Sequence, residues 1–425
     1  MTEPIYQNIF QTPKDAHYFF GYYNKPQISA DDSTLLALRV LAIDRLPDKN
    51  DEAEVGWFDL KSGDNRFHAI AKTTAYNWQQ GSMLQFLGPD FTSRVIWNTF
   101  EDGSYCSKIY DFRDQSVTTQ SAIYDVSKDG LTATVIDFER HTWCRRGYSY
   151  GNTHVNEKNK PVVTGDGIWK VDLSTGKKHQ IISIEDMIGH APLNTMDGAI
   201  HYLEHMLFNH NGQLFAFLHR WRHVNGIHSR LCVVDRDGKS IRIINDSGRM
   251  SHYCWLSNHE ILAYGALPNR INALRKKRGL VRTLFKWLMP IYRKLIHDQT
   301  KLSKHLTGDS YIIMNIENPK LNKNILPELR LSDGHPTMME DGNHVFTDTY
   351  ARSSIGEKPK LIRADVRTGK AELIDELNSI DALDETPLRC DLHPRLSPSG
   401  NIISIDTMND GMRSCYAYLT DKDRR

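Results

Sequence analysis

A degenerate repeat constrains the fold of this chain more than any other feature. It is clearest in DLHPRLSPSGNIISIDT (391–407), where a short strand, a tight Ser/Gly turn and an apolar strand follow one another. Further copies begin at residues 24, 82, 123, 204, 251 and 333. Most copies are followed by another strand and an Asp/Gly turn, as in PKLIRADVRTGK. Seven copies of a four-stranded unit predict an all-β fold, a seven-bladed β-propeller.

The length fits a single propeller domain over residues 1–425. It leaves about sixty residues per blade, more than the usual propeller repeat, so insertions are expected at about 140–200 and 266–308. The last repeat runs out after the strand SCYAYLT. We therefore expect residues 5–10 (IYQNIF) to supply the missing outer strand of the last blade and close the ring, which removes exposed sheet edges.

Composition describes an ordinary soluble globular chain. Hydrophobic residues make up 40%, charged residues 25%, and the formal net charge is +1, so nothing draws the whole chain toward nucleic acid. The first residues lack the pattern of a signal peptide, and no apolar run is long enough to cross a bilayer. The six cysteines show no close paired spacing. We expect reduced thiols and a cytoplasmic location.

One register of the repeat carries a histidine in four copies: His205, His252, His335 and His393. The first strand of each blade lines the central channel, so these positions face one another around the axis. Converging imidazoles suit a divalent cation such as Mn²⁺ or Zn²⁺. The alternative is four independent histidines that cap strand ends. Asp333 and Asp391, each two residues before a histidine, either orient the imidazoles or are solvated turn residues.

Several motifs together resemble a known family. The turns of the repeat, the histidines that precede them, and the segments HYFFGYY, NWQQGSMLQ and FLHRW are similar to the seven-bladed propeller polysaccharide lyases, the oligogalacturonate lyases and ulvan lyases. The likeness covers most of the chain in architecture but only short motifs in sequence. It implies β-elimination on a uronic-acid-containing saccharide at one end of the channel, with a metal held by histidines of neighbouring blades.

The same resemblance implies roles for the four histidines. His252, His335 and His393 match the metal-ligand positions, and His205 matches the blade that supplies the base or a further ligand. The chain departs from the family at a remaining polar ligand, since Thr337 or Ser332 stands at its place.

Elimination next to a carboxylate needs that carboxylate neutralised, a base, and an acid for the departing oxygen. Arginine grips a planar carboxylate better than lysine. We therefore expect Arg146 or Arg220 to clamp the carboxylate, His205 to act as base and Tyr148 to act as acid or as a partner of the departing oxygen, with His201 as a nearby substrate-binding candidate. The alternatives are that Arg220 lies on a solvated strand face and that Arg146 and Tyr148 belong to a loop salt bridge.

Residues that precede the inner strands are further substrate-binding candidates. Trp78 is placed to stack on a sugar ring, and Gln79 or Gln80 to bind hydroxyls, because the loops at one end of a propeller collect function. Packing between blades is the alternative for Trp78. Lys25, at or near the register of the histidines, is expected to face the channel.

The second insertion is strongly basic. Residues 269–305 contain many Lys and Arg and one acidic residue, Asp298. Apolar residues recur at helical spacing with basic residues between them, and Pro290 kinks or divides the helix. A basic amphipathic helix over 270–304, between blades five and six, predicts binding to an anionic membrane surface. Two alternatives are a helical hairpin packed on the propeller and attraction of an anionic polysaccharide.

Two functional hypotheses follow. The first is a metal-assisted lyase acting on an acidic poly- or oligosaccharide, in the cytoplasm or peripheral to the inner face of the membrane. The second is a non-catalytic propeller, a scaffold or glycan-binding protein docked to a membrane or partner through the basic helix. The histidines favour the enzyme, because a scaffold needs no titratable groups on its axis. Nucleic acid is not an expected partner, since the aromatics of the helix form an apolar face and no stacking platform.

Overall fold

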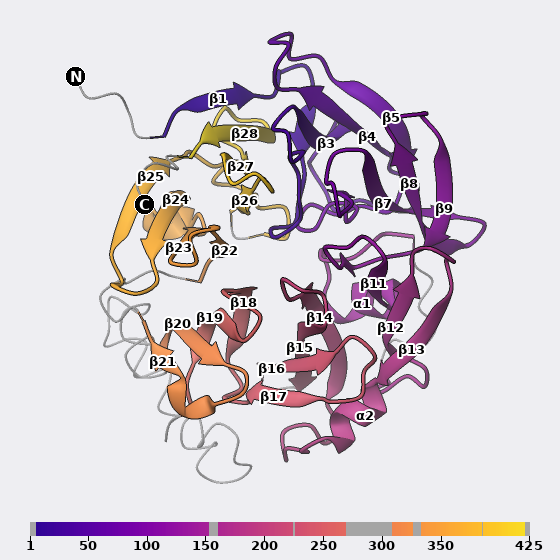
Figure 1. Cartoon of the computed structure of the whole chain (residues 1–425), viewed down its shortest axis with the longest axis vertical. Helices are drawn as coiled ribbons and strands as arrows, with labels where there is room; N and C mark the ends of the chain where they lie inside the picture. The colour runs from indigo at the N-terminus through magenta and orange to yellow at the C-terminus, as the bar shows by residue number, and fades with distance from the viewer. Residues whose placement is uncertain are drawn as a thin grey trace.

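The computed structural model describes residues 6–152, 160–223, 226–268, 308–325, 333–384 and 386–420. It confirms the all-β fold: seven four-stranded sheets are arranged around a central axis as a seven-bladed propeller (Figure 1). Within each sheet, neighbouring strands pair antiparallel. Figure 1 shows β14, β18, β22 and β26 nearest the centre and β9, β13, β25 and β1 at the rim.

The first three blades are meanders in chain order. Blade one contains β2 (His17–Phe19), β3 (Thr34–Val40), β4 (Ala53–Asp59) and β5 (His68–Thr73). Blade two contains β6 (Gln85–Phe86), β7 (Arg94–Glu101), β8 (Ser104–Asp111) and β9 (Val117–Ser121). Blade three contains β10 (Asp125–Val126), β11 (Thr132–Ile136), β12 (Gly167–Asp172) and β13 (Lys178–Ser183).

The next three blades repeat this order. Blade four contains β14 (Ile200–Phe208), β15 (Leu214–His223), β16 (Gly226–Asp235) and β17 (Arg242–Asn245). Blade five contains β18 (Met250–Trp255), β19 (Glu260–Ala266), β20 (Asp309–Asn315) and β21 (Lys323–Asn324). Blade six contains β22 (Thr337–Met338), β23 (His344–Asp348), β24 (Lys360–Asp365) and β25 (Ala371–Glu376).

Both ends of the chain contribute to blade seven. It contains β26 (Arg395–Leu396), β27 (Ile402–Thr407) and β28 (Ser414–Leu419), and its outer strand is β1 (Asn8–Gln11). β1 pairs antiparallel with β28, with Phe10 opposite Ala417. The first and last blades are thereby joined by hydrogen bonds as well as by packing, which ties the ring together.

Two short α-helices of the described residues follow strands of blade three, and both pack against β14 of blade four. α1 (Phe138–Cys144) follows β11 and is capped by Asp137, and α2 (Ile184–Gly189) follows β13 and begins at a Ser183 capping box. Because β12 and β13 belong to the blade, only parts of residues 140–200 are inserted. Two 3₁₀ turns, Pro319–Leu321 and Ser353–Ile355, complete the described helices.

The basic helix expected over 270–304 lies outside the described residues. Across the described ranges, no helix is long and apolar enough to cross a membrane.

The core lies between the blades, because the strands next to the channel are covered on both faces. In β3, residues 35–38 (LLAL) are all fully buried. Burying each leucine contributes about 1.5–3 kcal/mol. Two glycines bring the FGYY and QQG segments into backbone contact: a Cβ on Gly21 would lie 2.2 Å from the Gly81 nitrogen, and a Cβ on Gly81 would lie 2.1 Å from the Phe20 oxygen. No larger residue fits at either position.

Polar residues near the end of the second strand connect each of three blades to the next. Asn98 exchanges two hydrogen bonds with the backbone of Ile123, at 2.7 and 2.9 Å. Asp348 accepts from the N–H of His393 at 3.0 Å, and Asp406 accepts from two backbone N–H groups of blade one at 3.1 and 2.7 Å. These buried bonds fix the segments that carry the site.

Candidate active site

The four histidines of the repeat register lie together around the channel. The ring centroids are 5.2 Å apart for His205 and His252, 4.1 Å for His252 and His335, and 4.1 Å for His335 and His393. They belong to four consecutive blades, from the fourth to the seventh. The shared register therefore brings residues that are distant in sequence into one row.

Irregular backbone turns these histidines toward the axis. β14 and β18 each shift register at their histidine, so His205 and His252 lie in β-bulges, which re-aim side chains. His205 and His393 have positive φ angles of 56° and 45°. A non-glycine residue in this conformation costs about 1–3 kcal/mol and persists only where its surroundings hold it.

Three tyrosines hold His205 in place. The Tyr124 hydroxyl accepts from the His205 N–H at 3.0 Å, the Tyr253 hydroxyl donates to its carbonyl, and the Tyr22 hydroxyl is hydrogen-bonded to Nδ1. Nε2 lies 3.4 Å from the Arg145 guanidinium. His205 is thus surrounded by protein groups on both ring nitrogens, which leaves neither nitrogen open to a substrate.

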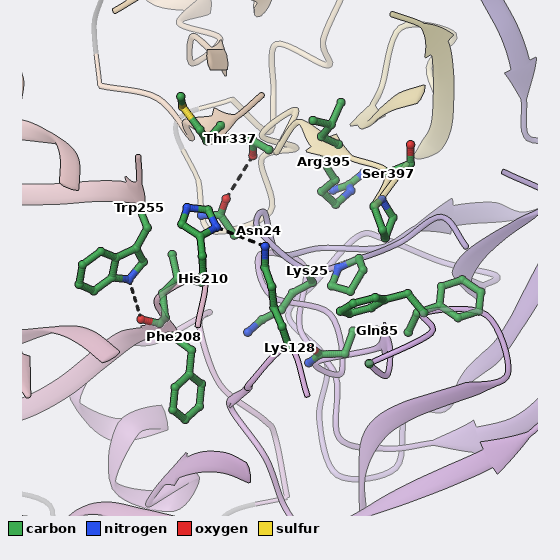
Figure 2. Close-up of a pocket in the computed structure, with 18 of the residues that line it drawn as sticks. Asn24, Lys25, Gln85, Lys128, Phe208, His210, Trp255, Thr337, Arg395 and Ser397 are labelled. Atoms are coloured by element: carbon green, nitrogen blue, oxygen red, sulfur yellow. Dashed lines mark hydrogen bonds between the residues drawn. The ribbon is translucent and has the colours of Figure 1, made fainter. Parts of the chain in front are cut away.

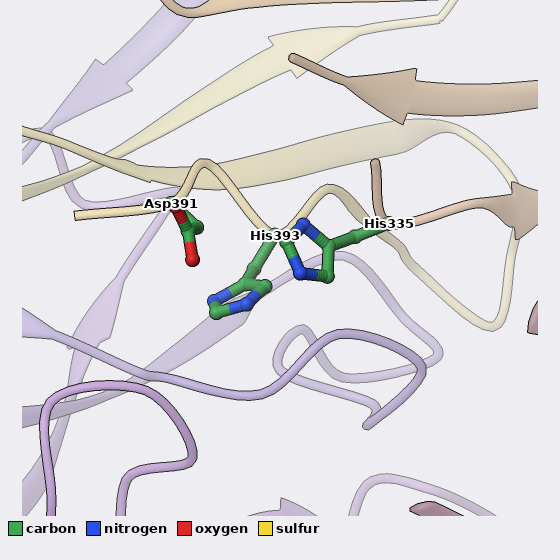
Figure 3. Close-up of side chains that lie close together, drawn as sticks. All are labelled: His335, Asp391 and His393. Carbon is green, nitrogen blue, oxygen red and sulfur yellow. The ribbon is translucent and has the colours of Figure 1, made fainter. Parts of the chain in front are cut away.

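His335, Asp391 and His393 form a compact, buried group of candidate metal ligands (Figure 3). One ligand atom of each lies within 4.8 Å of the others. His335 Nδ1 donates to Asp348, with distances of 2.9 and 3.0 Å to its two carboxylate oxygens, so Nε2 is the nitrogen left for a metal. Within the described ranges, the ring nitrogens of His393 have no hydrogen-bond partner.

The pKa values of the two imidazoles are shifted in opposite directions. Burial alone would lower the pKa of His335, but the carboxylates of Asp348, Asp391 and Asp333 together outweigh burial and raise it. Burial, and then the positive charge of His335, holds the pKa of His393 well below its usual range. His393 is therefore neutral at pH 7, the form that binds metals, whereas His335 holds its proton more tightly than a free imidazole does.

The donor chemistry of this group fits a divalent cation. Two imidazoles and a carboxylate are ligands for Zn²⁺ and Mn²⁺. Asp348 on His335 is the orienting carboxylate that metal-bound histidines usually have. Asp391 joins His335 and His393 in this compact group, and the third predicted ligand, His252, lies next to His335 with ring centroids 4.1 Å apart.

His252 lines a cavity of about 470 Å³ beside this group. Its Nδ1 lies 3.2 Å from an Asp333 carboxylate oxygen and 3.2 Å from the Tyr350 hydroxyl. In the described part of the chain, its Nε2 has no hydrogen-bond partner. Burial, and then the charge of His335, holds the pKa of His252 well below its usual range. In the tautomer whose Nδ1–H donates to Asp333, Nε2 is the unprotonated acceptor.

Two arginines of the cavity wall share one buried carboxylate. Arg145 Nη1 and Arg220 Nε both form ion pairs with Glu204, which is fully buried. Burial alone would raise the pKa of Glu204, but the two guanidiniums outweigh it and hold the pKa well below its usual range. Glu204 is therefore ionised, and it keeps the two guanidiniums side by side.

A third arginine connects the cavity to the candidate metal ligands. Arg389 Nε lies 2.9 and 3.0 Å from the two oxygens of Asp391, and Nη2 donates to the Tyr148 hydroxyl at 2.7 Å. The Tyr148 ring in turn lies against the Arg145 guanidinium, 3.9 Å from its central carbon. Arg389 and Tyr148 both line the cavity.

Two predicted residues lie elsewhere on the surface or in the core. Arg146 is exposed and does not line the cavity, and its neighbour Arg145 points inward instead. His201 is buried in blade four, where its Nδ1 is 2.9 Å from His219 and its Nε2 is 3.0 Å from the Met196 carbonyl. Burial lowers the pKa of His201 to about 4.

The predicted sugar-binding residues are buried as well. Trp78 donates to the Arg45 carbonyl at 2.9 Å and packs in the core of blades one and two. Gln79 donates to the Arg389 carbonyl, and Gln80 donates to Tyr124, each at 2.9 Å. Lys25 is 2% exposed and forms an ion pair with Asp125. The structure therefore gives Trp78, Gln79, Gln80 and Lys25 contacts within the protein.

Four charged residues of this site were not predicted from the sequence: Arg145, Glu204, Asp348 and Arg389. Two had a usable signal. Asp348 stands in HVFTDT at the repeat position of Asp406 in IISIDT, and Glu204 directly precedes a register histidine. Arg389 lies four residues before a register histidine but outside the repeat. Nothing in the sequence favours Arg145 over its neighbour.

Comparisons with known proteins establish the fold. No protein-family model and no curated protein sequence matches the chain. An oligogalacturonate lyase from Vibrio parahaemolyticus is 12% identical over 100% of this chain and 96% of its own, with a TM-score of 0.61. An oligogalacturonate lyase in complex with manganese is 13% identical over 98% and 93%, with a TM-score of 0.62.

A non-lyase propeller is also similar. The β-propeller domain of the trilobed protease from Pyrococcus furiosus is 11% identical over 94% of this chain and 96% of its own, with a TM-score of 0.50. The chain is thus a seven-bladed β-propeller that resembles oligogalacturonate lyases in structure. At this level of identity the likeness concerns the fold, and function has to be argued from the site.

Proposed function

We propose that the protein is a metal-assisted lyase that cleaves a uronic-acid-containing saccharide by β-elimination. One observation carries the proposal: His252, with an open Nε2, lines the same cavity as four arginines, and its ring centroid is 4.1 Å from that of the candidate metal ligand His335. A base, cationic groups for a carboxylate and a metal-binding group are the parts that this reaction needs. The structural resemblance to oligogalacturonate lyases supports the same chemistry.

The cavity arginines bind the substrate carboxylate in this mechanism. Arg145 and Arg220 are held in one orientation by Glu204, so little reorganisation is needed when the carboxylate arrives. A divalent cation on His335, Asp391 and His393 would withdraw negative charge from the carboxylate as the adjacent carbon loses its proton.

His252 is the base that the geometry favours, in place of His205. His252 Nε2 takes the proton from the carbon next to the carboxylate, and Asp333 stabilises the imidazolium that forms. The electron pair of the broken C–H bond becomes the new double bond, and the glycosidic C–O bond breaks with its electrons on the departing oxygen. The Tyr148 hydroxyl accepts from Arg389, so its own proton is available to that oxygen.

Incubation with oligogalacturonate and other uronate-containing glycans in the presence of Mn²⁺ tests the proposal. Elimination leaves a double bond conjugated to the carboxylate, so ultraviolet absorbance should rise with the wild-type protein. Arg145→Gln should slow the rise on the order of 100-fold, as removal of a transition-state contact does. Arg146→Gln is the matched control and should act like the wild type. No rise on any uronate glycan would contradict the proposed elimination.

A further inference from the structure

Arg389 is anchored through its backbone while its side chain spans two sites. Its carbonyl accepts from Gln79 at 2.9 Å and from Arg413 at 3.2 Å, so the main chain is fixed. The side chain is 25% exposed, whereas that of its partner Asp391 is 2% exposed. Side-chain rotation alone can therefore move the guanidinium without moving the blade.

Asp391 has two possible partners, the Arg389 guanidinium and a divalent cation. Arg389 Nε is nearly equidistant from both carboxylate oxygens, at 2.9 and 3.0 Å. The same carboxylate lies within 4.8 Å of the ligand nitrogens of His335 and His393. A divalent cation there would take electron density from Asp391 and repel the nearby guanidinium in a poorly screened, buried setting. The ion pair between Arg389 and Asp391 is therefore weakened when a metal binds.

The guanidinium has other contacts to keep it at the cavity. Nη2 donates to the Tyr148 hydroxyl at 2.7 Å, and the central carbon lies 5.2 Å from the Tyr350 ring centroid. Both tyrosines line the cavity that also holds His252. A guanidinium released from Asp391 thus remains beside the cavity with N–H groups available to donate. A planar carboxylate is the ligand that matches these N–H groups.

We propose that a divalent metal and Arg389 compete for Asp391, so that metal binding transfers the Arg389 guanidinium to the carboxylate of an acidic sugar in the adjacent cavity. This inference rests on the proposed function and deepens it, because it makes metal binding and acid binding cooperative. By linkage, each ligand must raise the affinity for the other by the same factor.

Calorimetric titration of the full chain with Mn²⁺ and with galacturonate tests the coupling. In the wild type, saturating Mn²⁺ should tighten galacturonate binding by about fivefold or more, and galacturonate should tighten Mn²⁺ binding equally. In Arg389→Gln, Mn²⁺ alone should bind more tightly than in the wild type, and the coupling factor should fall toward one. Arg352→Gln is the matched control, since Arg352 lines the same cavity but pairs with Glu357; it should keep the coupling.

The possible outcomes distinguish the competition for Asp391 from the proposed lyase function. Weaker Mn²⁺ binding in Arg389→Gln, or an unchanged coupling factor in that variant, would overturn the competition while leaving the lyase proposal intact. Coupling that survives in Arg389→Gln would mean that the metal contacts the carboxylate without help from Arg389. Absence of Mn²⁺ binding by the wild type would remove the proposed function and, with it, this inference.

Discussion

The two ends of the central channel differ in size and in chemistry. The larger cavity, about 920 Å³, lies where the inner strands end, and Figure 2 shows Lys128, His210 and Arg395 on its wall. The smaller cavity, about 470 Å³, lies where those strands begin: His252 lines it, whereas Trp255 at the end of the same strand lines the larger one. Volume alone would select the end that the proposed function does not use.

The two ends differ in whether an imidazole with an open ring nitrogen lies beside candidate metal ligands. At the larger cavity, Lys25 is paired with Asp125, and Arg395 lies 2.8 Å from Asp406. Lys128 and His210 are exposed, 3.2 Å apart. At the smaller cavity the arginines are paired too, with Glu204 and Asp391, but His252 with its open Nε2 lies beside the candidate metal ligands. A reactive site is marked by groups whose charge and hydrogen-bonding capacity are not used up by the fold.

Single substitutions, one at each cavity, test this comparison most strongly. His252→Gln removes the base and should lower kcat/KM for a uronate oligosaccharide by about 10²–10⁴-fold. Lys128→Gln, at the larger cavity, should leave kcat/KM unchanged. Steady-state rates from ultraviolet absorbance measure both. A larger loss in Lys128→Gln than in His252→Gln would place the chemistry at the other end.

A substitution at the larger cavity should change the stability of the protein. Lys25→Met leaves Asp125 as a buried, unpaired carboxylate and should reduce the free energy of unfolding by about 3–5 kcal/mol. The double variant Lys25→Met/Asp125→Leu removes both charges and should recover most of that loss. Urea unfolding measures the three proteins. Full stability of Lys25→Met would show that this ion pair contributes nothing, and would reopen a binding role for Lys25.

The repeat made the fold predictable, because its turns and alternating strands are local signals. The register of the four histidines was predictable for the same reason. The role of each histidine within this row was not predictable. Asp391 lies in the compact group with His335 and His393, and its neighbour Arg389 stands two residues away, outside the repeat, whereas His252 contacts Asp333 across blades.

Local geometry also decided which of two adjacent arginines enters the site. α1 ends at Cys144, and Arg145 is its C-cap, with φ −139° and ψ 84°. This change of direction points Arg145 toward Glu204 and leaves Arg146 exposed. Both residues are arginines, so no sequence pattern indicates which of them enters the site. Trp78 shows the converse: an aromatic near an inner strand proved to be core, as its alternative interpretation held.

The smallest expected effect concerns His201, a histidine away from both cavities. Its pKa is about 4 in the folded protein and 6.5 in a model peptide, because burial disfavours the charged form. Between these values the unfolded state binds more protons, so stability is complete above pH 6.5 and falls as the pH drops toward 4. From pH 7.5 to 5 the loss should be about 1–2 kcal/mol.

Urea unfolding of the wild type and His201→Asn at both pH values checks this. The variant should show a smaller pH-dependent loss. An equal loss in both proteins would assign the effect to other buried histidines, of which His219 is the nearest, 2.9 Å away.

Metal analysis of the purified protein tests the central claim most directly, namely that His335, Asp391 and His393 form a divalent-metal site beside the smaller cavity. After incubation with Mn²⁺ and desalting, the wild type should retain bound metal, and the double variant His335→Ala/His393→Ala should retain none. His205→Gln should keep its metal, because His205 is enclosed by tyrosines outside that group. A wild type without metal, or a double variant with as much as the wild type, would contradict the account.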